Sequence, residues 1–309
     1  MLALQTAYQQ TYRFIGSKAL PFLAWSELET AVAYWIDSYE ISPKKICNDI
    51  FPLLTCCAVG GKATQAIPLA AYWLLNVMAA RVFDDIQDKE GAEHPWNDAG
   101  LQQALPTGIA LLNVADICLS HLQTDQETFF EVINALKRAT ALAAKAQRYP
   151  PTKTTTMTQY IENSLALTGE IFAVGAWVGA RLHTSNSKIL CALEQYGRNL
   201  GLKMAIVNDC LDLAPEKATK LSDLTVAAYK LPVIYAASLT QHVKHSKLQS
   251  LLHTDVALQG ARLKEVVELL EEMGAIAWCL QLAGQFQQQA KVALDGLPDE
   301  IQQQLHAYV

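Results

Sequence analysis

Three aspartates at the end of an apolar segment are the residues in this sequence best suited to chemistry. The run AAYWLLNVMAARVFDDIQDKEG ends with Asp84, Asp85 and Asp88. In a helix, Asp84 and Asp88 lie on one face a turn apart, where like charges repel, and the carboxyl end of a helix is unfavourable for anions. A divalent cation would offset both penalties, and Mg²⁺ prefers such oxygen ligands. Taken alone, this cluster could equally be a solvated helix end.

A second cluster of oxygen-bearing side chains ends another apolar segment. The run GLKMAIVNDCLDLAPE carries Asn208, Asp209 and Asp212, and Glu216 follows Pro215. Asn208, Asp212 and Glu216 are spaced i, i+4, i+8 and would share one helical face, although Pro215 leaves the register of Glu216 open. Two such helix ends can face each other across a bundle, hold Mg²⁺ between their carboxylates and let a diphosphate bridge the ions. The repeated pattern favours a metal site over two unrelated solvated ends.

The segments that carry these clusters predict an all-α fold. Ala-, Leu-, Gln- and Glu-rich stretches dominate, period-2 alternation is nearly absent, and Gly and Pro breakers separate helices of about 15 to 30 residues. Residues 63–88 and 160–182 are apolar nearly all round, as in helices at the centre of a bundle. We predict one all-α domain over residues 1–309, a single large helical bundle in which residues 1–20 form a loose N-terminal helix.

Composition excludes several classes of protein. The 309 residues include 24 Lys and Arg against 30 Asp and Glu, a net charge of −6, and 51% are hydrophobic. Disorder needs lower hydrophobicity, and nucleic-acid binding needs a basic surface, so we expect no nucleic-acid partner. The 7 cysteines show no paired spacing and predict free thiols in a reducing cytoplasm.

Two further features bear on location. The N-terminal sequence lacks the basic start, apolar run and cleavage site of a signal peptide. Residues 63–80 carry no charge, but they include Gln65, Pro68 and Asn76, and the aspartates follow closely. A buried core helix is therefore the better interpretation than a membrane span, and we predict a cytoplasmic protein with no stable span.

The order of the motifs resembles that of trans-isoprenyl diphosphate synthases, the polyprenyl synthetase superfamily. The motifs are DDIQD (84–88), LTGEIFAVGAWVGARL (167–182), YGRNLGLKMAIVNDCLDL (196–213) and KLPVIYA (230–236). The closing AGQFQQQAKVALDGLP is also similar to the last helix of that family. The resemblance runs from about residue 20 to the end, and the two acidic motifs are its most specific part.

This resemblance implies an all-α isoprenoid synthase fold, a homodimer and a deep apolar pocket. It also implies that three Mg²⁺ ions clamp the diphosphate of an allylic prenyl diphosphate, so that pyrophosphate leaves and an allylic cation forms. The implied metal ligands are Asp84, Asp85, Asp88, Asn208, Asp209, Asp212 and Glu216. The residues implied in catalysis are Asp84, Asp88, Asn208 and Asp212.

The chain departs from the family's pattern at the basic residues that grip phosphate. Before Pro52 it has CNDIF in place of the Gly-Lys-Arg stretch that binds isopentenyl diphosphate, and only Lys44 and Lys45 lie nearby. KEGAEHPWN stands in place of an arginine pair after the first motif. Further replacements are Leu167 for the Lys of Lys-Thr-Gly, Met204-Ala205 for Phe-Gln and Ala227-Ala228 for Gly-Lys. Mg²⁺ can still hold one diphosphate, whereas a second, metal-free diphosphate would lack a cation.

We therefore predict a Mg²⁺-dependent class I terpene synthase that ionises a linear prenyl diphosphate of C15 or longer and cyclises or quenches the cation. The series Asn208, Asp212, Glu216 resembles the metal triad of terpene synthases, with Asp in its middle place. The first alternative is a prenyltransferase, which uses isopentenyl diphosphate or a non-diphosphate acceptor. The second alternative is a non-catalytic partner subunit of a prenyl synthase.

Seven residues are candidates for binding the substrate: Ala79, Ala80, Arg81, Phe83, Thr168, Phe172 and Lys203. By the resemblance, Ala79 and Ala80 form a small pocket floor that admits a long chain, although alanines also serve in helix packing. The aromatic rings could shield a cation or simply pack in the core. Arg81 and Lys203 could replace a lost phosphate-binding lysine or lie along the surface. We expect His94 to be solvated.

Overall fold

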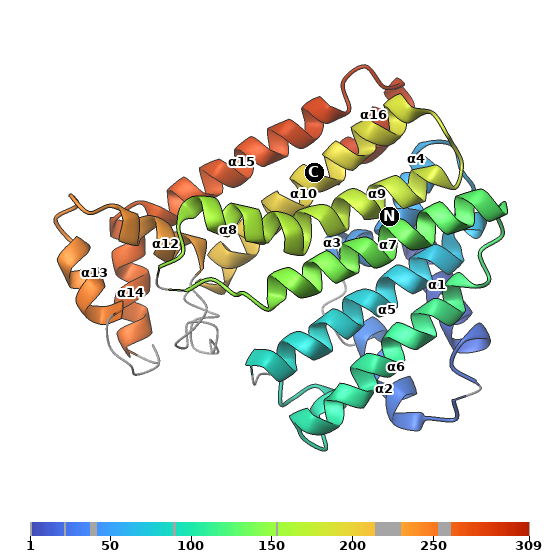
Figure 1. Ribbon diagram of the computed structural model, residues 1–309, viewed down its shortest axis with the longest axis horizontal. Helices are drawn as coiled ribbons and strands as arrows, with labels where there is room; N and C mark the ends of the chain where they lie inside the picture. The colour runs from blue at the N-terminus through green and yellow to red at the C-terminus, as the bar shows by residue number, and fades with distance from the viewer. Residues whose placement is uncertain are drawn as a thin grey trace. The chain divides into compact units, whose positions relative to one another are not determined.

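The structure is a computed structural model and describes residues 2–21, 23–37, 42–88, 91–152, 154–213, 230–252 and 261–308 (Figure 1). Every regular element in these ranges is a helix, which confirms the all-α prediction. Up to residue 147 the elements are α1 (Leu2–Lys18), α2 (Ser26–Asp37), α3 (Pro43–Asp49), α4 (Phe51–Ala58), α5 (Ala63–Asp88), the 3₁₀-helix η1 (Pro95–Asn97), α6 (Leu101–Leu119) and α7 (Gln126–Gln147).

The remaining elements include one short π-helix. They are α8 (Met157–Ser164), the π-helix η2 (Leu165–Gly169), α9 (Glu170–Arg181), α10 (Ser187–Asp212), α12 (Leu231–Ser238), α13 (His245–Leu252), α14 (Ala261–Glu272), α15 (Ala275–Ala293) and α16 (Asp299–His306). The chain forms two compact units. Unit 1 comprises Met1–Ala135, Gly175–Leu193 and Gly296–Tyr308, and unit 2 comprises Leu136–Val174 and Glu194–Asp295. The prediction of one domain over the whole chain stays a prediction.

Unit 1 is organised around α5, whose bounds agree with the predicted segment 63–88. α1, α4 and α6 pack against it, and Leu69, Leu74 and Leu75 have no exposed surface. The N-terminal helix, expected to be loose, packs on α5 and buries Ile15 completely. α5 has no polar face along its length because apolar residues surround it on nearly every side. Its charged residues are concentrated in the acidic cluster at its end.

Two short helices precede α5, in contrast to the long helices expected from the sequence. α3 has 7 residues and α4 has 8, and Ile50 separates them. Pro52 stands in the first turn of α4, where its missing N–H costs no intrahelical hydrogen bond, whereas it could not continue α3. Ser42 caps α3, with its side chain accepting a hydrogen bond from the Lys45 N–H at 3.1 Å.

The length and apolar composition of α5 would also suit a membrane span. Among the helices that the structure describes, α5 alone passes this test, and 67% of its most apolar window is buried within the protein. A mostly buried core helix passes the same test, so the feature is weak support for a span.

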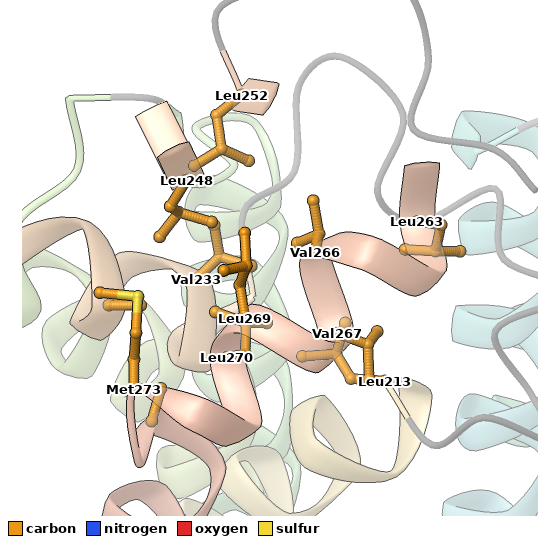
Figure 2. Packing of buried hydrophobic residues seen from close by; sticks show 12 residues of the cluster. Leu213, Val233, Leu248, Leu252, Leu263, Val266, Val267, Leu269, Leu270 and Met273 are labelled. Atoms are coloured by element: carbon orange, nitrogen blue, oxygen red, sulfur yellow. The ribbon is translucent and has the colours of Figure 1, made fainter. Parts of the chain in front are cut away.

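Unit 2 has an aliphatic core built by its C-terminal helices. Figure 2 shows side chains from α12, α13 and α14 converging on one another, with Leu213 at the end of α10 among them. Val233, Leu248, Val266 and Leu270 have no exposed surface. Residues 231–236 of the KLPVIYA motif therefore belong to helix α12, whose apolar side is fixed by packing, and Lys230 is the N-cap residue of that helix.

Two glycines of α10 allow its close approach to η2 and α9. A Cβ on Gly197 would lie 2.2 Å from the Phe172 carbonyl oxygen, and one on Gly201 would lie 2.6 Å from that of Thr168. Any side chain at either position would push the helices apart. The close contact fixes Thr168 and Phe172 against the helix that carries the second acidic cluster.

Gly197→Ala should lower the free energy of unfolding by about 1–3 kcal/mol, because the new methyl group overlaps a backbone carbonyl. Gly284→Ala is the matched control. Gly284 lies inside α15 with open space around its Cα, so alanine there should raise stability by about 0.5–1 kcal/mol. Urea denaturation followed by circular dichroism measures both, and changes of the same sign would contradict the role assigned to Gly197.

Candidate active site

The first acidic cluster occupies the last turn of α5, as predicted. Asp84 is partly exposed and Asp88 is exposed, and the four-residue spacing places both on one side of the helix. Asp85 differs from them, since its side chain is only 1% exposed. The cluster therefore consists of two accessible carboxylates and one buried carboxylate.

Asp85 is surrounded by donors from its own helix and from the loop that follows. Arg81 Nε forms an ion pair with Asp85 Oδ1 at 2.9 Å. On the other oxygen, Oδ2, His94 Nδ1 lies at 2.7 Å and Trp96 Nε1 donates a hydrogen bond at 2.8 Å. Asn97 Nδ2 is 3.4 Å away. Oδ1 has the ion pair with Arg81 but accepts no hydrogen bond from the described residues, whereas the donors of the loop gather on Oδ2. A carboxylate held in this way is better suited to fix the loop than to bind a metal ion, although its role as a ligand stays a prediction.

Gly91 is the residue that lets this loop fold back on Asp85. Its φ is +68°, a left-handed conformation that glycine adopts without strain. A Cβ there would lie 2.4 Å from Asp85 Oδ2 and 2.5 Å from His94 Nδ1. The Gly91 carbonyl also accepts a hydrogen bond from Asn97 Nδ2 at 2.7 Å. Residues 91–97, the described part of the stretch that lacks the family's arginine pair, are thus packed onto the first motif.

The expectation that His94 is solvated was wrong. Its side chain is 6% exposed, and its ring lies 4.6 Å from that of Trp96, centroid to centroid. Trp96 in turn makes an edge contact with Tyr34 of α2 at 6.0 Å. The sequence gives one signal that was missed: an imidazole, an indole and an amide within a short loop after the motif are all able to donate to a buried carboxylate.

The second acidic cluster ends α10 and has the same composition of accessible and buried groups. Asn208 is exposed, Asp212 is partly exposed, and the Asp209 side chain is 12% exposed. Asp209 Oδ2 accepts hydrogen bonds from Tyr160 Oη at 2.5 Å and from the Leu231 N–H at 2.8 Å. Burial raises the pKa of Asp209, and these donors together with Lys230 oppose that shift.

Lys230 is a cation at this cluster that sequence reasoning missed. Its ammonium lies 2.9 Å from Asp212 Oδ2 and 3.5 Å from Asp209 Oδ1. Lys230 is 18 residues beyond Asp212 in the chain, so helical spacing gave no sign of the contact. Glu216, the last predicted ligand, lies outside the described residues, as do Ala227 and Ala228. The two acidic clusters belong to different units, Asp84 to unit 1 and Asp212 to unit 2.

One basic candidate, Arg81, and a further arginine of α10, Arg198, are engaged by carboxylates. Arg81 pairs with Asp85, as described above. Arg198 donates two hydrogen bonds to the Glu170 carboxylate, at 2.6 and 3.0 Å, and a third to Glu194 at 2.7 Å. These contacts raise the pKa of the Arg198 guanidinium. Lys203 is half-buried on α10.

The apolar candidates have different surroundings. Ala79 is fully buried, whereas Ala80 is exposed. The Phe83 ring packs so closely on α6 that a Cβ on Gly108 would be 2.6 Å from it. Phe172 is buried, and Thr168 is half-buried within the π-helix η2. Their roles in binding a substrate stay predictions.

A closed polar cluster occupies the region before Pro52 where the family has basic residues. Lys45 Nζ donates to Asp49 Oδ2 at 2.6 Å and to Tyr8 Oη at 3.1 Å. Tyr8 Oη and Trp35 Nε1 also donate to Asp49 Oδ2, at 3.0 and 3.2 Å. Asp49 is 2% exposed. The lysine that might have replaced the missing basic residues therefore neutralises an internal carboxylate.

The accessible carboxylates fit Mg²⁺ as a partial set of ligands. Within the described ranges, no three His, Cys, Asp or Glu side chains lie close enough to form a metal site by themselves. Mg²⁺ commonly binds through one or two carboxylates and completes its shell with water and substrate phosphates, and Asp84, Asp88 and Asp212 could serve in this way. The ion would supply Lewis acidity at a bound diphosphate.

Comparison with known proteins identifies the family. A family model described as polyprenyl synthetase matches residues 42–270. The chain belongs to the polyprenyl synthetase family. It is 26% identical over 295 residues to a geranylgeranyl diphosphate synthase of Methanosarcina mazei, which covers 91% of this chain and 87% of that protein. The resemblance drawn from the motifs is thereby confirmed.

Solved structures of similar fold cover nearly the whole chain of this polyprenyl synthetase. A geranylgeranyl pyrophosphate synthetase from Pyrococcus horikoshii has a TM-score of 0.80 and 22% identity, over 98% of this chain and 93% of that one. A polyprenyl synthase from Caulobacter crescentus, complexed with calcium and isoprenyl diphosphate, has a TM-score of 0.81 and 20% identity, over 98% and 94%. These matches show the fold.

The family assignment favours the prenyltransferase alternative over the terpene synthase that the sequence analysis predicted. The protein is an enzyme of the polyprenyl synthetase family, a family of prenyltransferases that depend on Mg²⁺ in general. The terpene synthase interpretation is not confirmed, and its prenyltransferase alternative fits the comparisons better. The number of Mg²⁺ ions, the homodimer and the cytoplasmic location stay predictions.

Asp85→Asn should lower the free energy of unfolding by about 2 kcal/mol, because it removes the charge that Arg81, His94 and Trp96 surround. Asp84→Asn, one residue away on the more exposed side of the turn, should lose less stability. Urea denaturation measures both variants. Mn²⁺ binding, followed by electron paramagnetic resonance, should weaken more in Asp84→Asn. The reverse order in both measurements would show that Asp85 is a metal ligand and not an anchor.

Proposed function

We propose that the protein is a trans-type prenyltransferase that elongates an allylic prenyl diphosphate with isopentenyl diphosphate. The observation that carries this proposal is the pair Asp84 and Asp88, accessible at the end of a buried apolar helix in a chain that the polyprenyl synthetase family model matches. The relative from Methanosarcina mazei is a geranylgeranyl diphosphate synthase, which supports a C20 product.

In this proposal some residues of the acidic clusters bind metal and others hold the local structure. Asp84 and Asp88 hold Mg²⁺ at one cluster, and Asn208 and Asp212 hold it at the other. When bound, the ion supplies the Lewis acidity that lets pyrophosphate depart from the allylic carbon. Asp85 keeps the loop after the first motif in place, and the apolar length of α5 keeps water from the allylic cation.

A second candidate is prenyl transfer to an acceptor that carries no diphosphate. The closed cluster of Lys45, Asp49 and Tyr8 favours it, because this cluster leaves a neutralised lysine where the family binds isopentenyl diphosphate through basic residues. An acceptor without phosphate needs no such cation.

The test is an incubation of the purified protein and Mg²⁺ with C10, C15 and C20 prenyl diphosphates, each with and without isopentenyl diphosphate. Elongated diphosphates that require isopentenyl diphosphate are the expected products. A hydrocarbon or alcohol from a single diphosphate would instead show a terpene synthase. Pyrophosphate release only when an aromatic or peptide acceptor is added would favour the second candidate, and inactivity throughout would indicate a partner subunit.

Asp84→Ala and Asp88→Ala should each reduce the rate of elongation by about a hundredfold or more, since each removes a ligand of the ion that stabilises the leaving pyrophosphate. Gln87→Ala, at an exposed neighbour on the same turn, is the control and should retain most of the rate. Radiolabelled isopentenyl diphosphate measures incorporation. Near-normal rates in both aspartate variants would exclude this metal assignment.

Ala80→Phe should shorten the product, because a phenyl ring one turn before Asp84 fills space that the growing chain would enter. Ala80 is exposed and can accept the ring without repacking the core, whereas Ala79 is fully buried. Mass spectrometry of the hydrolysed products gives the distribution of chain lengths. Ala141→Phe, at an exposed position of α7, is the matched control. An unchanged distribution in Ala80→Phe would remove this residue from the prenyl pocket.

A further inference from the structure

Lys230 lies immediately before α12 and directs its side chain to the second acidic cluster. Its side chain is 18% exposed, and its ammonium is 2.9 Å from Asp212 Oδ2 and 3.5 Å from Asp209 Oδ1. Contacts this short, in a partly buried setting, are stronger than those of a solvated surface pair.

The position of this lysine is fixed through its neighbour in the chain. The Leu231 N–H donates to Asp209 Oδ2 at 2.8 Å, and Tyr160 Oη donates to the same oxygen at 2.5 Å. Leu231 itself has no exposed surface. Asp209 Oδ2 thus accepts hydrogen bonds from a main-chain donor and a buried phenol, and Asp209 anchors the start of α12 to the end of α10. Lys230 is held beside Asp212 as a consequence.

The Lys230 ammonium makes the net charge of this cluster less negative than that of two carboxylates alone. One ammonium neutralises part of the field of Asp209 and Asp212. Of these two carboxylates, Asp212 is the more accessible, with 30% of its side chain exposed against 12% for Asp209. A metal ion that approaches this cluster would therefore reach Asp212 first. The Asp212 carboxylate is already paired with the Lys230 ammonium.

We propose that Lys230 is a resident cation of the second acidic cluster, which a divalent metal displaces from Asp212 when it binds. This inference rests on the proposed function, which makes Asp212 a metal ligand. Without substrate, the ammonium competes with the metal and lowers its affinity. A diphosphate adds negative charge at the site, so metal and diphosphate together bind more favourably than the metal alone. The lysine thereby couples loading of the metal to arrival of the substrate.

The test is Mn²⁺ binding to the full-length protein without diphosphate, followed by electron paramagnetic resonance. Lys230→Met should bind Mn²⁺ about three- to tenfold more tightly than the natural protein, because the competing ammonium is gone. Lys230→Arg keeps the charge and should stay near the natural affinity. Lys230→Gln is a second neutral variant, and thermal melts establish that each variant is folded.

Two controls separate displacement from a general change of charge. Lys247→Met removes an exposed lysine of the same unit that pairs with Glu265 at 2.7 Å, and it should leave Mn²⁺ affinity unchanged. In an Asp212→Asn background, Lys230→Met should have no effect, because the carboxylate for which lysine and metal compete is absent. A merely structural role for Lys230 would not produce this dependence on Asp212.

Unchanged or weaker Mn²⁺ binding in both folded neutral variants would overturn the proposal, and so would an equal gain in Lys247→Met. If Asp212→Asn leaves Mn²⁺ binding unaltered in the natural background, no metal competes at Asp212. That result would overturn the proposal through failure of the metal assignment, which distinguishes it from failure of the lysine's role. Adding inorganic pyrophosphate should reduce the difference between Lys230→Met and the natural protein.

Discussion

The cost of burying a carboxylate at the end of an apolar helix governs both acidic clusters. Each cluster contains one aspartate that is almost withdrawn from water, Asp85 in the first and Asp209 in the second. An isolated buried carboxylate would be expensive, and each is offset by donors gathered from outside its own helical turn. Trp96 and His94 approach Asp85 from the following loop, and Tyr160 approaches Asp209 from another helix. The buried member thus fixes local structure, whereas its neighbours Asp84, Asp88 and Asp212 are more exposed to solvent.

This arrangement explains which parts of the site could be predicted from the sequence. Spacing on a helix identifies which carboxylates share a face, and the bounds of α5 follow from its apolar run and flanking breakers. Spacing cannot show which aspartate of a motif turns inward, because that depends on residues brought in by the fold. Tyr160 is 49 residues from Asp209, and Lys230 is 18 from Asp212. The π-helix η2 lies in close contact with Gly201, and residue types alone gave no sign of this element.

The basic residues near the predicted site are used to a large extent within the protein itself. Three of them each pair with a carboxylate of their own unit. These are Arg81 with Asp85, Arg198 with Glu170 and Glu194, and Lys45 with Asp49. A guanidinium held by two carboxylates has most of its donors engaged, and moving it to a phosphate would leave those carboxylates unpaired. In the proposed function, recognition of a diphosphate would therefore depend largely on metal ions.

Loss of phosphate-binding cations and change of reaction type are separable, and this is why the sequence pointed toward a terpene synthase while the family points toward prenyl transfer. In the proposed function the acidic clusters would serve the departure of pyrophosphate, a step that cyclising and chain-extending enzymes on this fold share, so their presence does not distinguish the two. The two classes of enzyme differ in the group that reacts with the allylic cation after pyrophosphate has left. That choice would depend on the shape and charge of the site where the acceptor binds. In the segment before Pro52, where the family resemblance would place isopentenyl diphosphate, Lys45 is already neutralised by Asp49. An acceptor bound there would gain little from its own negative charge, and the energy that orients it would have to come from apolar contact or from metal shared with the first substrate.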